Sequence, residues 1–328
     1  MSRRQAASLA LAITLSAVVS LGCSGGSSST AAGSQASRSS PRFVLDQDFP
    51  DPDVLRVGDI YYAYATNTAA VNVQVATSPN FNTWTVSDAD ALPTLPSWAV
   101  PGKTWAPEVS EFSPGRYVMY FTTANESPAL QCIGVATATG PAGPFKPVGN
   151  GPIVCPADGG GAIDPSTFVD TDGARYLIWK NDGNCCALDT WLQVAPLSAD
   201  GLQLSGSTTR LVKQTARWEG SVIEAPVLVK HGSKYVLFYS ANNYANRSYA
   251  IGYATASSVT GPYLKRGQPL LSTKSAHGRY VGPGGQDIIG APDGSDRIVF
   301  HSWDPAVAYR GMNTLRLTWS DDEPLVAP

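Results

Sequence analysis

The chain of 328 residues is 43% hydrophobic and only 15% charged, enough apolar material for the core of one large domain or two ordinary ones. A net charge of −3 without a basic stretch argues against nucleic acid as a partner. The 31 glycines and 25 prolines suit short strands joined by turns, and a 3.6-residue apolar period is hard to find beyond the N-terminus, so we expect an all-β fold.

The N-terminus has the pattern of a secretory signal peptide over residues 1–22. Arg3 and Arg4 form its charged start. Residues 10–21 form an apolar run that is too short for an ordinary membrane span. We therefore expect an exported protein.

Cys23 is a candidate for lipidation. It follows Ser20-Leu-Gly, which is similar to a bacterial lipobox, although leucine is usual where Ser20 stands. We expect a cell-surface lipoprotein, with free secretion as the alternative, and no other membrane contact. Residues 23–41 are rich in Ser, Gly and Ala and predict a flexible tether, so the folded domain should span residues 42–328.

The folded part repeats one pattern five times. An aromatic or β-branched strand follows a glycine-containing turn at residues 60–66, 116–122, 175–180, 234–240 and 297–303. The steps are 56, 59, 59 and 63 residues if the following positions are equivalent: Tyr61, Tyr117, Tyr176, Tyr235 and Ile298. Such a unit is too small to bury its own face, so the repeat predicts a single-domain, five-bladed β-propeller. A β-sandwich is the alternative, but it does not predict this period.

A second strand with a distinctive start precedes each repeat strand. The starts are Asp51-Pro-Asp-Val, Trp105-Ala-Pro-Glu-Val, Asp164-Pro-Ser-Thr-Phe, Glu224-Ala-Pro-Val-Leu and Gly284-Gly-Gln-Asp-Ile. The first strand of a propeller blade lies nearest the axis, so these starts should converge at one end of the central channel. We expect a common pocket lined by Asp51, Trp105, Asp164, Glu224 and Gln286.

Three carboxylates and an indole in one cavity are costly for structure alone, because buried charges need partners. They suit glycoside hydrolysis, which uses two carboxyl groups on opposite sides of the scissile bond. One group must be protonated near neutral pH and the other ionised. The predicted partner is therefore a carbohydrate.

The motif set resembles glycoside hydrolase family 43 from about residue 42 to the end of the chain. The matching motifs are Phe49-Pro-Asp51-Pro-Asp, Trp105-Ala-Pro-Glu, Ile163-Asp164-Pro-Ser-Thr-Phe-Val-Asp-Thr-Asp-Gly and Ile223-Glu224-Ala-Pro. The resemblance implies a five-bladed propeller that hydrolyses arabinofuranosides and xylosides with inversion.

The resemblance also implies roles for individual residues. Asp51 would be the general base that activates water, and Glu224 the general acid that protonates the leaving oxygen. Asp164 would orient Glu224 and raise its pKa through a nearby like charge. Trp105 would form an apolar wall for a sugar face.

Two further polar side chains are candidate substrate contacts. Gln286 belongs to the fifth strand start, and Arg279 precedes the same glycine-rich stretch. No cofactor is expected. Many arabinan-cleaving members have a histidine after Gly-Pro-Gly that helps to hold an axial calcium or halide, but Gly285 stands there in this chain, so an axial metal is in doubt.

The leading functional hypothesis is an α-L-arabinofuranosidase or arabinanase, expected to act as a monomer. A β-xylosidase or a galactofuranosidase is the alternative within the same family. A retaining fructosidase relative would carry Arg-Asp-Pro, which does not occur here. A non-catalytic sugar-binding propeller lipoprotein is a third hypothesis, and retention of all three carboxylates argues against it.

Four cysteines remain after Cys23, in a context expected to be oxidising. Four cysteines allow three connectivities. Cys132 could pair with Cys155, which leaves a vicinal disulfide between Cys185 and Cys186. Neither spacing resembles a zinc site, so we expect structural disulfides, with a vicinal ring beside the substrate as the alternative.

Overall fold

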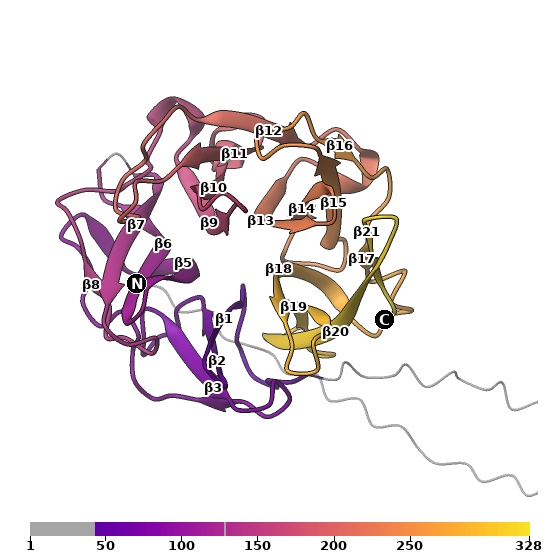
Figure 1. Cartoon of the computed structure of the whole chain (residues 1–328), viewed down its shortest axis with the longest axis horizontal. Helices are drawn as coiled ribbons and strands as arrows, with labels where there is room; N and C mark the ends of the chain where they lie inside the picture. Colours follow the sequence, from indigo (N-terminus) through magenta and orange to yellow (C-terminus); the bar gives the residue numbers. More distant parts are fainter. Residues whose placement is uncertain (1–42, 128) are drawn as a thin grey trace, which may run out of the picture. The chain divides into compact units, whose positions relative to one another are not determined.

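Five antiparallel sheets form the part of the chain that the computed structural model describes, residues 43–127 and 129–328. The sheets stand around a common centre as the blades of a propeller (Figure 1). The all-β, five-bladed fold is therefore confirmed. The predicted signal peptide, Cys23 and most of the tether lie outside the described residues. Among the described residues, no helix is long and apolar enough to cross a membrane.

The blades follow one another along the chain. Blade 1 contains β1 (Asp53–Val57), β2 (Ile60–Ala65), β3 (Gln74–Ser78) and β4 (Thr85–Val86). Blade 2 contains β5 (Ala99–Ser113), β6 (Arg116–Asn125), β7 (Gln131–Ala138) and β8 (Lys146–Pro147). Blade 3 contains β9 (Ala162–Val169), β10 (Arg175–Asn181), β11 (Trp191–Pro196) and β12 (Thr209–Lys213).

Blade 4 contains β13 (Ile223–His231), β14 (Lys234–Ala241), β15 (Ala250–Ala256), β16 (Leu264–Lys265) and β17 (Leu271–Ser272). Blade 5 contains β18 (Val281–Gly290), β19 (Asp296–Trp303), β20 (Arg310–Ser320) and β21 (Glu323–Val326). Three short 3-10 helices lie between strands: η1 (Ala157–Gly159), η2 (Gly183–Cys186) and η3 (Arg217–Glu219).

The first strands of the five blades surround the axis. β1, β5, β9, β13 and β18 contact one another in turn, and β18 contacts β1 to complete the ring (Figure 1). The start of the described chain joins this closure, because the Val44 N–H donates to Met312 O in blade 5 at 2.9 Å. Contacts between neighbouring blades therefore close the ring around the axis.

Strand register refines the predicted repeat. The residues opposite Asp53, Glu108, Ser166, Val227 and Asp287 are Tyr64, Tyr120, Ile178, Phe238 and Val299. The predicted equivalent positions lie three residues before these partners in blades 1, 2 and 4. They lie two residues before the partner in blade 3 and one before it in blade 5, so the prediction is one residue out in blade 3 and two in blade 5. The hairpin turns and bulges differ in length, and alternating apolar strands look alike after a small shift.

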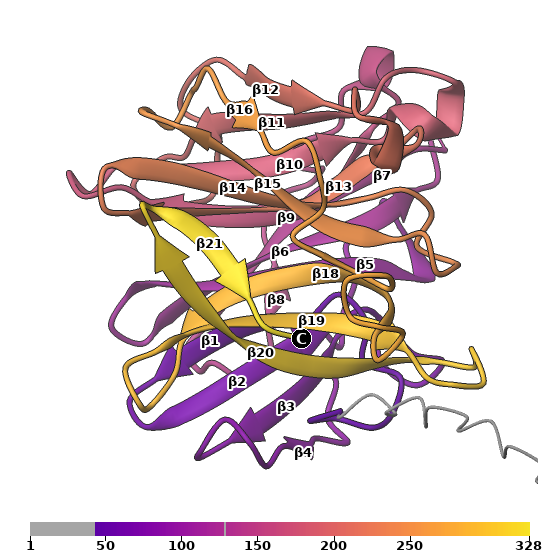
Figure 2. The ribbon, with the colours of Figure 1, turned by 90° about the vertical axis from the view of Figure 1, so that its right-hand side faces the viewer.

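The core lies between the blades rather than within them. Ile178 of blade 3 and Leu237 of blade 4 belong to one buried cluster, and Val75 of blade 1 and Met119 of blade 2 belong to another. In the side view the sheets lie against each other in layers (Figure 2). Opening the ring would expose two apolar faces to water, which explains why the five blades form one domain.

Candidate active site

One residue with a left-handed backbone lies just before β1, and one lies within each of the other four inner strands. The φ angles are 55° at Asp51, 42° at Ala106, 57° at Asp164, 49° at Ala225 and 55° at Gly285. This conformation is uncommon for residues other than glycine, and in blades 2 to 5 it coincides with a break in strand register. The break redirects the neighbouring side chains towards the end of the channel.

These five residues define equivalent positions in the ring. Asp51 and Asp164 occupy the same position, as predicted. Trp105 and Glu224 come one residue before it, and Gln286 comes one residue after it. The site residues of the five strand starts are therefore offset by one residue in three blades.

A cavity of about 560 Å³ lies at this end of the channel. Asp51, Trp105, Asp164 and Glu224 line it together. Its volume is within the range of small-molecule sites. The other residues that line it include Thr66, Lys180, Asp182, Asn184, Asn242, Tyr244, Tyr249 and Arg310.

The two other predicted contacts do not line this cavity. Gln286 lines a narrow axial channel of about 40 Å³, where its side chain accepts a hydrogen bond from Ser240 Oγ and donates one to Ala225 O. The one-residue offset explains this position. Arg279 is also outside the cavity lining, and the arginine that lines it is Arg310 at the start of β20.

Asp51 is surrounded by groups that favour its ionised form. Thr66 Oγ1 donates to its Oδ2 at 2.8 Å, and Arg310 Nη1 lies 3.4 Å from its Oδ1. Burial alone would raise the pKa of Asp51, but the Arg310 charge and the Thr66 hydrogen bond help to hold it well below its ordinary value. Asp51 is therefore a carboxylate at neutral pH.

The fully buried side chain of His301 supports Asp51. The Asp51 N–H donates to His301 Nδ1 at 3.1 Å. Burial and the Arg310 charge lower the pKa of His301, so the imidazole is neutral. Its Nδ1 acts as an acceptor and fixes the backbone of Asp51 rather than supplying charge.

Glu224 is held by two donors. Tyr249 OH donates to its Oε1 at 2.8 Å, and Lys180 Nζ lies 3.2 Å from its Oε2. Burial raises the pKa of Tyr249, which keeps the phenol neutral. Burial alone would lower the pKa of Lys180, but the charges of Glu224 and its neighbours raise it, so the ammonium persists.

Asp164 carries the raised pKa of this cavity. Burial and the Glu224 charge raise the pKa of Asp164 to about 8. Its Oδ2 accepts the N–H of Ala225 at 2.9 Å, so it also fixes the backbone next to Glu224. Asp164 is therefore protonated at neutral pH.

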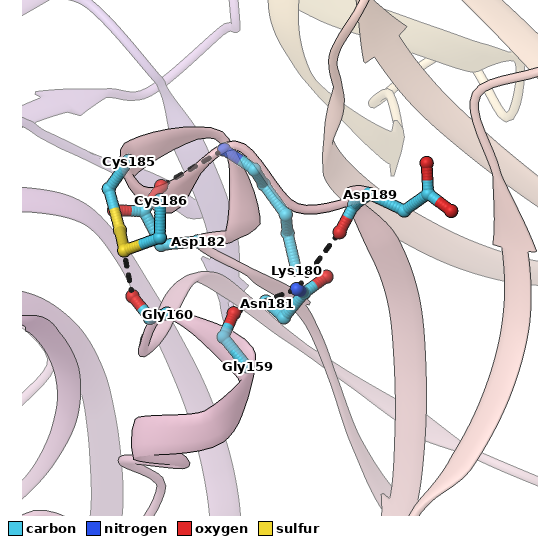
Figure 3. The surroundings of a disulfide bond; sticks show 8 residues. All are labelled: Gly159, Gly160, Lys180, Asn181, Asp182, Cys185, Cys186 and Asp189. Atoms are coloured by element: carbon cyan, nitrogen blue, oxygen red, sulfur yellow. Dashed lines mark hydrogen bonds and ion pairs between the residues drawn. A yellow bond between two sulfur atoms is a disulfide. The ribbon is translucent and has the colours of Figure 1, made fainter.

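A disulfide-bonded turn supports Lys180. Lys180 Nζ also lies 3.3 Å from Asp182 Oδ1, at the entry to η2, where Cys185 and Cys186 form a vicinal disulfide. Figure 3 shows Lys180 directed towards Asp182, and the disulfide against Gly160. Cys132 and Cys155 form a second disulfide. The vicinal bridge thus lies on the turn that carries a wall of the cavity.

A sequence model of glycosyl hydrolases family 43 matches residues 41–324. The chain belongs to glycosyl hydrolase family 43. The motifs that carried the resemblance therefore identify the family correctly, and the chain is a glycosidase that hydrolyses O-glycosyl compounds.

Several relatives in the family act on arabinan or related furanosides. The chain is 27% identical over 270 residues to an extracellular endo-α-(1→5)-L-arabinanase of Bacillus subtilis, with 77% of this chain and 80% of the relative covered. It is 28% identical over 272 residues to an extracellular exo-α-(1→5)-L-arabinofuranosidase of Streptomyces avermitilis, with 76% of this chain but only 54% of the relative covered. A β-D-galactofuranosidase of Aspergillus niger is 27% identical over 272 residues, with 77% and 73% covered.

Solved structures of family 43 share the fold. A thermostable family-43 glycoside hydrolase superposes with a TM-score of 0.76 at 30% identity, covering 86% of this chain and 93% of that chain. An endo-1,4-β-xylanase from Bacteroides thetaiotaomicron superposes with a TM-score of 0.73 at 30% identity, covering 88% and 97%.

Below the cavity, this family-43 chain carries three more carboxyl groups. Asp287, Asp53 and Glu108 belong to blades 5, 1 and 2, and each accepts a backbone N–H from the next blade. Burial, followed by neighbouring carboxylate charge, raises the pKa of Asp53 and raises that of Asp287 to about 8. These groups therefore link successive blades around the axis.

The axial position does not fit the histidine that other members carry. A side chain at Gly285 would come within 2.6 Å of His301 Nδ1 and 2.7 Å of Asp51 Oδ1. Within residues 43–127 and 129–328, no group of three or more His, Cys, Asp or Glu side chains is arranged to hold a metal ion. His301 thus fills the space beside Gly285.

Proposed function

We propose that the protein is an inverting glycosidase that cleaves α-L-arabinofuranosyl linkages. The observation that carries this proposal is the meeting of an ionised Asp51, a hydrogen-bonded Glu224 and a protonated Asp164 in one cavity. Inversion requires one base and one acid on opposite sides of the scissile bond.

In the proposed mechanism, Asp51 takes a proton from a water molecule as its oxygen attacks the anomeric carbon. The bond from that carbon to the leaving oxygen breaks, and Glu224 donates its proton to this oxygen. Arg310 and Thr66 keep Asp51 ionised before attack. Each group ends the cycle with the other's protonation state, and exchange with solvent restores both.

The proton of the acid is supplied by Asp164 in this proposal. Asp164 stores this proton at neutral pH because its pKa is about 8. When the leaving oxygen reaches Glu224, the proton must reside on Glu224 and the negative charge on Asp164. Asp164 is thus proposed as the residue that positions the acid, through the Ala225 N–H, and supplies its proton.

The substrate proposal rests on the relatives. The arabinanase of Bacillus subtilis and the arabinofuranosidase of Streptomyces avermitilis make α-L-arabinofuranosyl bonds the first choice. The β-D-galactofuranosidase of Aspergillus niger supports galactofuranosides as a second candidate, since both substrates present a five-membered ring. Trp105 is proposed as the apolar wall of this ring.

The test is a panel of 4-nitrophenyl arabinofuranosides, galactofuranosides and xylosides, with proton NMR of the first sugar released. We expect hydrolysis of the α-L-arabinofuranoside with the β-anomer appearing first. Release of the α-anomer first would contradict inversion. Hydrolysis of only another glycoside would show that the arabinofuranoside assignment is wrong.

We also propose that the protein is exported and works as a monomer without a cofactor. Several relatives are named extracellular, which supports export. Lipidation of Cys23 is tested by replacing Cys23 with alanine and following membrane fractionation. Activity that survives dialysis against EDTA would support the absence of a metal requirement, and its loss and recovery with calcium would refute it.

A further inference from the structure

A second cavity, of about 650 Å³, lies on the other side of the loop that joins β14 and β15. Asn242, Asn243 and Tyr244 of this loop line the candidate active site, whereas Arg247 and Ser248 line the second cavity. The remaining walls come from η3, the turn at residues 272–278, and the segment between β19 and β20. The proposed mechanism does not use this cavity.

The second cavity is lined by cations and by no carboxylate. Arg247 and Lys274 are exposed at its wall. Neither side chain has an ion-pair partner among the described residues. Two acids adjoin the lining residues: Glu219 is buried and paired with Lys265 at 2.6 Å, and Asp304 is buried and accepts backbone N–H groups of the segment between β19 and β20. In a chain of net charge −3, this local excess of positive charge favours an anionic ligand.

Two indoles supply flat apolar surfaces. Trp218 stacks on Tyr239 with ring centroids 5.9 Å apart, and it lies so close to Gly252 that a Cβ there would come within 2.5 Å of the indole. Trp303 Nε1 donates to Tyr244 O at 2.9 Å. Both indoles are therefore held in place, and such faces can cover the C–H groups of a sugar ring.

The walls that carry the two cations are tied to each other. Thr273 Oγ1 donates to Arg247 O at 2.7 Å and accepts the Gly282 N–H at 2.9 Å. The turn that bears Lys274 is thus fixed to the loop that bears Arg247. His277 and Val307, which also line the cavity, have φ angles of 51° and 58°, a backbone strain that is often found at binding sites.

We propose that the second cavity binds a uronic acid unit of the polysaccharide whose neighbouring arabinofuranosyl bond is cleaved. Arg247 and Lys274 would contact the carboxylate, and Trp218 and Trp303 the sugar ring. This rests on the proposed function, because the shared loop places the cavity next to the site of cleavage. Arg310 links the two sites, since its guanidinium lies over Tyr244 at 5.2 Å and over Trp303 at 6.0 Å.

The test is calorimetric binding of trigalacturonate and of its methyl ester, which has the same rings without the charge. A glucuronic-acid-substituted xylotriose distinguishes glucuronate from galacturonate as the source. We expect the free acid to bind at least tenfold more tightly than the ester, and added NaCl to weaken binding. Equal binding of acid and ester, or binding of neither acidic oligosaccharide at millimolar concentration, would overturn the proposal.

Variants locate the binding. The double variant R247A/K274A should raise the Kd for the acidic oligosaccharide at least tenfold. The matched control K146A/R316A removes the same charge from two exposed residues elsewhere and should leave the Kd unchanged. An equal loss in both variants would show that only net charge matters and would refute the site.

Aryl arabinofuranoside hydrolysis separates this proposal from the proposed function. R247A/K274A should keep the wild-type rate, because neither residue lines the catalytic cavity. Uronate binding by a protein that does not hydrolyse the aryl arabinofuranoside would refute only the proposed function. Hydrolysis without uronate binding would refute only the second site.

Discussion

At the scale of residues, the site holds two carboxyl groups with opposite protonation states in one cavity: Asp51 is ionised and Asp164 is protonated. Arg310 and Thr66 stabilise the charge of Asp51, while burial and Glu224 keep Asp164 protonated. A glycosidase needs this separation of pKa values between its carboxyl groups. Lys180 contacts both Glu224 and Asp182 of the disulfide-bonded turn, so its replacement tests the site directly.

Replacing Lys180 with methionine should reduce kcat/KM by about 10- to 100-fold. The loss of the ammonium also removes the charge that favours ionised Asp164, so the alkaline limb of the pH–rate profile should move to higher pH. Lys146→Met is the matched control at an exposed position. An alkaline limb that stays in place or moves to lower pH would refute this role of Lys180.

The residues predicted from the sequence were those that lie in proline-flanked motifs at strand starts. Asp51, Trp105, Asp164 and Glu224 all line the cavity. Lys180, Tyr249 and Arg310 were missed because they lie on or just before second and third strands, where no motif marks them. One feature of the sequence could have identified Lys180. It is a charged residue directly after the apolar run Leu177-Ile-Trp, where a charge is tolerated only if it is paired.

At the scale of elements, the left-handed residue in or just before each inner strand directs the neighbouring side chains towards the end of the channel. The repeat could be predicted from the sequence because apolar strands and turns recur. The one-residue offsets of Trp105, Glu224 and Gln286 could not be predicted. They depend on where each bulge falls, and both registers place apolar residues on the same faces.

The η2 turn offers a test at this scale. The variant C185S/C186S removes the vicinal disulfide next to Asp182, which should loosen the Lys180 contact and lower kcat/KM about 2- to 10-fold. Thermal stability should change little, because the turn is exposed. A reducing agent should lower the activity of the wild type but not that of the variant. Unchanged kinetics in the variant would show that the turn holds Lys180 without the bridge.

At the scale of the whole molecule, buried carboxyl groups around the axis make ring closure sensitive to pH. Asp287 has a pKa of about 8 in the folded protein and an ordinary one when unfolded. The folded state therefore holds this proton more tightly, and its contribution to stability is lost as pH rises from about 4 to about 8.

The variant D287N should test this effect without the charge. Its Tm relative to wild type should rise by a few degrees between pH 5 and pH 8, because only the wild type loses a stabilising proton over this range. Asp88→Asn, at an exposed position, serves as the control for a general charge effect. A relative Tm that is constant or falls with pH would contradict the assignment of a raised pKa to Asp287.

The most direct test of the central claim compares D51N and E224Q on arabinofuranosides with good and poor leaving groups. The acid matters less when the leaving group is already acidic, so E224Q should lose about 10²- to 10⁴-fold on an alkyl arabinofuranoside but far less on the 2,4-dinitrophenyl compound. D51N should lose activity on both substrates to a similar extent, since both need an activated water. Equal losses on both substrates for E224Q, or an undiminished rate for D51N, would contradict the assigned roles.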